Sequence, residues 1–151
     1  MSILKPARVD EYLSSINMTS KYSEFDLIDS ILDQNQKKSL KILDYLRDSN
    51  VSEVFVLYLL QTEVRKFLYL RQNISPKPYI PSFKQKQYNS LMSIFEPSSL
   101  ESLIRRCFIL DKYIKSNSKM KYVWDSFEEI VVILTSSAHR DMIERRLNYE
   151  Y

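Results

Sequence analysis

The stretch that decides the fold is VSEVFVLYLLQTEVRKFLYLRQN, residues 51–73. Its first half contains an unbroken apolar run, residues 54–60. The β-branched members of this run suit a strand, but the sequence continues through residues 61–71 without a turn signal, so length favours a helix. We predict one helix from Ser52, a suitable N-cap, to about Gln72. Because its first half is apolar on every side, this pattern is typical of the central helix of a bundle.

Glycine and proline usage points to the same fold class. The chain has no glycine, so no residue favours phosphate-cradling loops, tight hairpin turns or glycine-closed helix ends. Helices with polar caps remain. The five prolines stand at positions 6, 76, 78, 81 and 97, which leaves residues 7–75 and 98–151 open to helices. Residues 73–82, which hold three of the prolines, are predicted to form a loop.

Apolar spacing and polar caps predict further helices on both sides of the central one. Phe25, Ile28 and Leu32 share a face, and Ser23 stands in front of them as an N-cap. The predicted helices span residues 8–16, 25–33, 36–47, 52–72, 83–95, 98–114 and 122–134. The expected architecture is an all-α bundle of about five to six helices at residues 22–135. Residues 1–21 precede it as a terminal helix and a connector, and residues 136–151 follow as a charged tail.

Several chemistries have little support in this sequence. Cys107, the single cysteine, lies on a predicted apolar stripe, where a buried and inert thiol is expected. His139 is predicted to lie on the surface, and Glu128 and Glu129 occupy adjacent helical positions that do not face each other. Glycine-rich nucleotide-binding loops are impossible in a chain without glycine. Together these features lead us to expect no catalytic residue, metal or cofactor. No apolar run approaches 18 residues, and the cysteine content indicates a reducing, cytoplasmic setting.

Two segments combine basic and aromatic residues. Residues 105–121 carry six basic side chains opposed only by Asp111, which indicates either a solvated helix face or a phosphate-facing surface. The proline-rich loop is followed by aromatic residues interleaved with lysines, a pattern that suits stacking on bases but equally suits anchoring of the loop. The candidate DNA contacts are Tyr79, Phe83, Lys84, Lys86, Lys119 and Lys121, with Tyr88 and Lys77 nearby.

The order of segments resembles one known family. The sequence FDLIDSILDQNQKKSLKILDYLRDSNVSEVFVLYLLQTEVRKFLYLRQN, residues 25–73, is similar to the junction of the middle and C-terminal domains of bacterial DNA polymerase III delta subunits. YVWDSFEEIVVIL, residues 122–134, resembles the last helix of the C-terminal collar domain in that family. LKPARVDEYL, residues 4–13, resembles the end of the middle domain.

The resemblance implies a non-catalytic role within a DNA-directed DNA polymerase, a nucleotidyltransferase. Delta subunits belong to the clamp loader, which places the beta sliding clamp on primed DNA during replication. Their collar domain packs against the collars of the gamma/tau and delta-prime subunits, and primer-template DNA lies close by as a secondary partner. The beta clamp is bound through an N-terminal domain. Since no such domain is in this sequence, we expect a fragment that does not open clamps.

A collar domain needs one helical face for its core and others for its neighbours. Because a ring of different subunits assembles head to tail, two different outer faces are required. The candidate interface residues are Leu100, Ile104, Phe108, Trp124 and Val131. The alternative is a stand-alone helical module that binds DNA or protein. A DNA-binding regulator of that kind requires a helix-turn-helix with a basic second helix.

Overall fold

The computed structural model describes residues 21–136, and these form an all-α bundle with no strand among them. The predicted helix at 8–16, nearly all of both flanking segments and His139 lie outside the described residues. Among those described, no helix is long and apolar enough to cross a membrane. The elements are α2 (Glu24–Leu32), α3 (Gln36–Asp48), α4 (Glu53–Gln72), the 3-10 turn η1 (Ser82–Lys84), α5 (Gln85–Met92), α6 (Pro97–Lys115) and α7 (Met120–Leu134).

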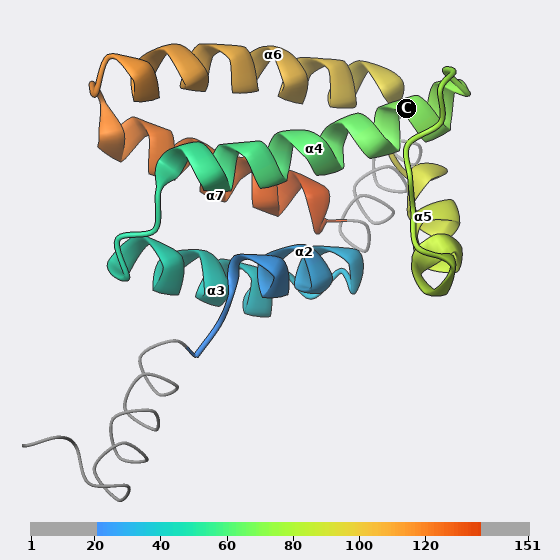
Figure 1. The fold of residues 1–151 in the computed structure, drawn as a ribbon, viewed down its shortest axis with the longest axis horizontal. Coiled ribbons are helices and arrows are strands. Elements are labelled where there is room, and N and C mark those ends of the chain that lie inside the picture. Colours follow the sequence, from blue (N-terminus) through green and yellow to red (C-terminus); the bar gives the residue numbers. More distant parts are fainter. Residues whose placement is uncertain (1–20, 137–151) are drawn as a thin grey trace, which may run out of the picture.

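Helix α4 runs through the middle of the molecule (Figure 1). It packs against α6 on one side and α2 on the other, while α7 crosses behind it and α5 closes the end near the proline-rich loop. The prediction of a central helix is therefore confirmed. Helices α2 and α3 form an antiparallel hairpin, tied by a hydrogen bond of 2.8 Å between the buried hydroxyls of Ser30 and Ser39.

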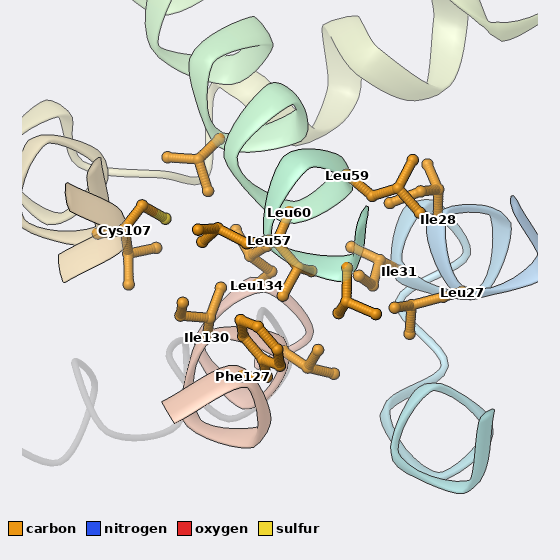
Figure 2. Close-up of a cluster of buried hydrophobic side chains, with 14 of the residues drawn as sticks. Leu27, Ile28, Ile31, Leu57, Leu59, Leu60, Cys107, Phe127, Ile130 and Leu134 are labelled. Carbon is orange, nitrogen blue, oxygen red and sulfur yellow. The ribbon is translucent and has the colours of Figure 1, made fainter. Parts of the chain in front are cut away.

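One continuous core joins these helices. Figure 2 shows side chains of α2, α4, α6 and α7 converging, including Ile31, Leu60, Cys107 and Phe127. On α7 the buried apolar residues include Val123, Phe127, Ile130, Val131 and Leu134. Because burying one such side chain contributes about 1.5–3 kcal/mol, this shared core is the main stabilising feature of the fold.

The starts of α2, α4 and α6 can each be compared with a polar or proline signal in the sequence. Ser23 caps α2 through a capping box. The Ser23 hydroxyl accepts a hydrogen bond from the Asp26 backbone N–H, and the Asp26 carboxylate accepts one from the Ser23 backbone N–H. Pro97 is the first residue of α6, as its lack of an N–H favours. Ser52 precedes α4 but makes no side-chain capping bond.

Polar residues occupy the left-handed positions at the helix ends that glycine often occupies in other proteins. The chain turns through the left-handed region at Gln34, Asn50, Asn73 and Asn117, each just after a helix. There the last carbonyls are satisfied, for example by the Val51 N–H donating to the Leu46 carbonyl at 3.1 Å. Asparagine tolerates this conformation better than most residues with a side chain. Helical hairpins thus close without glycine.

Three predictions need correction. The helix expected at 83–95 is shorter, because residues 82–84 form a 3-10 turn and the α-helix stops at Met92. Helix α7 begins at Met120 instead of 122, directly after Lys119 in a left-handed conformation. Phe25 shares the α2 stripe with Ile28 by spacing, yet its side chain is exposed.

Candidate functional site

The proline-rich loop presents two exposed aromatic side chains. Tyr79 and Phe83 are 83% and 81% exposed, whereas Tyr88 is 1% exposed and Ile80 is buried. Both roles predicted for this segment therefore have residues that suit them. Ile80 and Tyr88 anchor the loop, and Tyr79 and Phe83 remain available for stacking. Lys86 is exposed and makes no ion pair with any acidic residue between 21 and 136.

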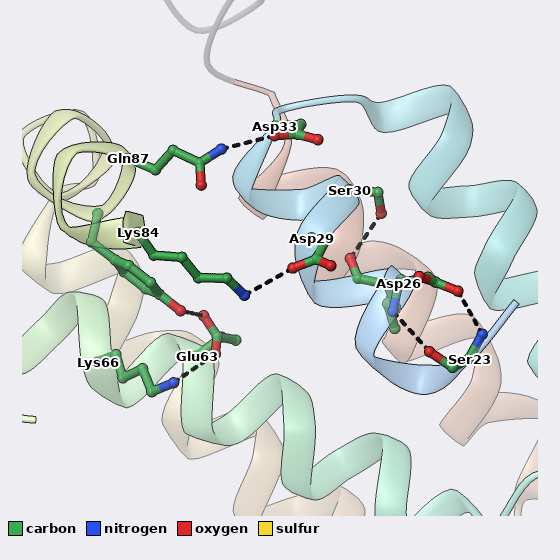
Figure 3. A network of polar contacts seen from close by, with 11 residues as sticks. Ser23, Asp26, Asp29, Ser30, Asp33, Glu63, Lys66, Lys84 and Gln87 are labelled. Atoms are coloured by element: carbon green, nitrogen blue, oxygen red, sulfur yellow. Dashed lines mark hydrogen bonds and ion pairs between the residues drawn. The ribbon is translucent and has the colours of Figure 1, made fainter. Parts of the chain in front are cut away.

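Lys84, by contrast, is engaged in holding the loop. Its ammonium lies 2.9 Å from a carboxylate oxygen of Asp29 on α2, and it lies 5.9 Å from the centre of the Phe83 ring. Gln87 donates to Asp33 at 2.8 Å, a second contact between α5 and α2 (Figure 3). The Lys84 charge is therefore largely balanced, which leaves Lys86 as the freer cation of this pair.

Beneath the loop lies a buried polar network on Glu63. The Tyr88 hydroxyl donates to one carboxylate oxygen at 2.5 Å, and the Lys66 ammonium lies 3.1 Å from the other. Burial, and then the charge of Glu63 and its hydrogen bond, raise the pKa of the Tyr88 phenol far above its ordinary value. Figure 3 shows this network beside the Lys84–Asp29 pair. Its role is to fasten α5 onto α4.

The second basic cluster lies at the corner between α6 and α7. Lys119 and Lys121 are exposed, and the Lys119 ammonium lies 5.1 Å from the centre of the Tyr113 ring. Tyr113 meets Tyr122 edge to face at 5.6 Å. Lys115 pairs with Asp111 at 2.7 Å, so only part of the positive charge is free. This corner therefore offers aromatic and basic groups together.

The structure does not bring the two basic clusters together. The loop lies at one end of α6 and the α6–α7 corner at the other (Figure 1). Helix α6 has 19 residues, and at 1.5 Å of rise per residue the clusters are about 28 Å apart. A single ligand must be extended to contact both.

The five candidate interface residues divide between core and surface. Leu100 and Val131 are fully buried within the bundle. Trp124 is also buried; its indole N–H donates to Glu53 at 3.2 Å, which ties α7 to the start of α4. Ile104 is half-buried, and Phe108 is 53% exposed. Of these five residues only Phe108 and part of Ile104 are exposed, so Leu100, Trp124 and Val131 are corrected to core residues of the bundle.

An exposed apolar surface on α2 and α4 was missed by sequence reasoning. Phe25, Val54 and Tyr58 are 62%, 60% and 61% exposed, and Phe25 meets Phe55 edge to face at 6.4 Å. We call Phe25, Val54, Phe55 and Tyr58 the α4 patch. The signal was present, because a helix apolar on every side has more apolar surface than its neighbours cover. Its direction could not be read from the run itself.

The remaining titratable candidates are structural. Cys107 is buried, and this burial raises the pKa of its thiol to about 11 although Arg65 and Arg106 lower it. Glu129 forms an ion pair with Arg106 that links α7 to α6. Glu128 and Glu129 are both exposed. Among residues 21–136 no group of three potential metal ligands occurs.

Comparisons with known proteins add no relative: no family model matches the chain, and no curated protein matches it.

Proposed function

We propose that this chain is a non-catalytic assembly domain, the collar part of a bacterial DNA polymerase III delta subunit. In that role it holds the clamp loader together while the loader places the beta clamp on primed DNA. The order of its segments supports this proposal, as does the all-α bundle, which is the architecture that such a domain requires.

The observation that carries the proposal is the position of the exposed apolar side chains. One group is the α4 patch, between α2 and α4. The other consists of Phe108 and Ile109 on the outer side of α6. Because α2 and α6 pack against opposite sides of α4 (Figure 1), these are two separate faces. Two different faces are what a head-to-tail ring of subunits needs, and an exposed cluster of large apolar side chains commonly marks an interface.

The test is co-purification with the gamma/tau and delta-prime subunits from the same source. The chain is produced together with each partner, and the complex is separated by size-exclusion chromatography. We expect association with at least one partner. If the chain keeps its helical circular-dichroism spectrum and its cooperative unfolding but binds neither partner, the proposal fails.

A secondary contact with primer-template DNA is part of the same proposal. At the loop, Tyr79 and Phe83 are available for stacking and Lys86 for phosphate. At the α6–α7 corner, Lys119 and Lys121 are available. Since duplex DNA rises about 3.4 Å per base pair, only a duplex of about eight base pairs or more can reach both clusters.

The stand-alone DNA-binding alternative has less support. A helix-turn-helix sets its two helices at roughly 90–120° to each other. Here α2 and α3 lie antiparallel along their length, linked through Ser30 and Ser39 (Figure 1). This arrangement buries the hairpin against α4 and α7 and does not project α3 as a recognition helix.

A further inference from the structure

A groove runs along the outer side of α4, beside the α4 patch. It consists of two adjoining pockets of ≈ 180 and ≈ 390 Å³, both lined by Thr62 and Lys66. Phe25 and Leu59 line the first pocket. Tyr58 and Tyr69 line the second, where the proline-rich loop forms the opposite wall. We call these two pockets together the α4 groove.

The spacing of residues on α4 makes this groove straight. Val54, Tyr58, Thr62, Arg65 and Tyr69 follow one another at intervals of four, four, three and four. Side chains at such intervals lie on one side of a helix. The row extends over about 22 Å at 1.5 Å per residue. A helix of roughly 15 residues has the same length, so the row can match a helix laid beside it.

The two pockets of the groove differ in charge. Around the first pocket, Lys66 pairs with Glu63 and Lys84 pairs with Asp29, so that pocket is nearly neutral. In the second pocket, Arg65 and Lys77 are exposed and form no ion pair within the described part of the chain. The groove thus has a nearly neutral pocket and a cationic pocket, which meet at Thr62 and Lys66.

These properties favour a protein helix over other ligands. The first pocket is smaller than the about 300–1,000 Å³ typical of small-molecule sites, and it suits a single side chain. A nucleic acid strand carries a phosphate at every nucleotide and gains affinity from each cation that it meets. Of the basic residues that line the groove, only Arg65 and Lys77 lack an ion pair among residues 21–136, and Asp29 lies beside the first pocket.

We propose that the α4 groove binds an amphipathic helix of a neighbouring clamp-loader subunit, an inference that rests on the assembly role proposed above. That helix places large apolar side chains against Phe25, Val54 and Tyr58. Its carboxylates face Arg65 and Lys77, which line the same pocket as Tyr58. This mode, in which an amphipathic helix lies in an apolar groove, recurs in peptide recognition.

The main test replaces one exposed side chain on each outer face. Tyr58→Glu places a charge in the α4 groove, and Phe108→Glu is the matched control on α6. Both side chains are exposed, so helical content and unfolding temperature should remain those of the unmodified chain. Dissociation constants are measured for gamma/tau and for delta-prime. We expect Tyr58→Glu to weaken one of the two partners more than about tenfold, as loss of a central aromatic contact does. Phe108→Glu should leave that partner's affinity unchanged.

A second pair of variants tests the cationic pocket. Arg65→Glu combined with Lys77→Glu should weaken the same partner about three- to tenfold and flatten its salt dependence, because charges at an interface rim act mainly on encounter. The control, Lys38→Glu combined with Lys41→Glu on α3, changes the net charge equally on another part of the surface. It should leave this partner unaffected.

The outcomes separate the groove from the assembly role. If the unmodified chain binds both partners and Tyr58→Glu weakens neither, the groove proposal is overturned and the assembly role stands. Binding of neither partner by the unmodified chain overturns both. If the chain instead self-associates and Tyr58→Glu makes it monomeric, the occupant is a second copy of the chain. If Tyr58→Glu abolishes only the binding of oligo(dT), the occupant is a nucleic acid. Either result overturns the proposed helix.

Discussion

Glu63 carries a buried carboxylate that depends on two neighbouring side chains of the same molecule. Its carboxylate is buried on α4 and is satisfied by the Tyr88 hydroxyl and the Lys66 ammonium. A buried charge that loses a hydrogen bond pays the desolvation penalty of the group left unpaired. The attachment of α5 to α4 therefore rests on one phenolic O–H as well as on apolar packing.

Replacement of Tyr88 by phenylalanine tests this contact. The ring and its contact with Phe67, at 5.4 Å between centres, are kept. The lost hydrogen bond should lower the free energy of unfolding by about 1–3 kcal/mol, measured by urea denaturation. Tyr79→Phe removes the same hydroxyl from an exposed ring and should cost almost nothing. Equal effects of the two substitutions would mean that the Glu63 network does not stabilise the fold.

Cys107 gives stability a dependence on alkaline pH. Burial raises the pKa of its thiol from 9.0 to about 11. Above pH 9 the unfolded chain loses this proton, whereas the folded chain keeps it until the pH approaches 11. The free energy of unfolding therefore falls as the pH rises from 9 to 11. Below pH 9 the contribution is constant.

A comparison with Cys107→Ala isolates this effect, because the two proteins differ at this side chain alone. The variant should have a lower free energy of unfolding at pH 8, because it lacks the buried sulfur atom that packs in the core. The difference between the two unfolding free energies should narrow between pH 9 and 11. Parallel stability curves over that range would show that the thiol is not buried as described.

At the scale of elements, the starts of α2 and α4 offer a matched pair of serines. Ser23 caps α2 in a capping box, whereas Ser52 precedes α4 without a side-chain bond. Ser23→Ala should destabilise the chain by about 1 kcal/mol, and Ser52→Ala by much less. Chemical denaturation of both variants measures the difference. A larger loss at Ser52 would contradict the capping geometry.

The sequence predicted most of these elements because their boundaries depend on local chemistry. Pro97 can occupy only the first turn of a helix without cost, and Asn50 or Asn73 readily accepts the left-handed turn that ends one. The end of α5 was predicted poorly, since the apolar spacing of Leu91 and Phe95 continues beyond the last helical residue, Met92. Packing of Phe95 against Phe67, at 4.9 Å between ring centres, maintains that spacing without a helix.

The surface was less predictable than the core. Leu100 and Phe108 stand on the same helix at plausible interface positions, yet only tertiary contacts decide that Leu100 is buried and Phe108 exposed. The exposure of Tyr58 likewise depends on where α2 and α6 dock on α4. The aromatic character of the loop was visible, but its division into anchoring Tyr88 and exposed Phe83 was not.

At the scale of the whole molecule, the two separated basic clusters predict a distinct DNA response. Lys86→Glu with Lys119→Glu and Lys121→Glu should weaken binding of the assembled loader to primed DNA and lower the slope of log affinity against log salt. Lys84→Glu is a poor probe, because it also breaks the pair with Asp29. Lys37→Glu with Lys38→Glu and Lys41→Glu on α3 provides a control of equal charge change. Unchanged affinity and salt slope in the first variant would remove DNA contact from the proposed function.

The central claim is that this chain joins two neighbours through two separate helical faces. Native mass spectrometry of the chain mixed with the gamma/tau and delta-prime subunits tests it most directly. The prediction is a species that contains one copy of this chain and both partners, and that loses one partner when Tyr58 is replaced by glutamate. A chain that stays folded yet appears only as a free species, or never with both partners at once, would contradict the claim.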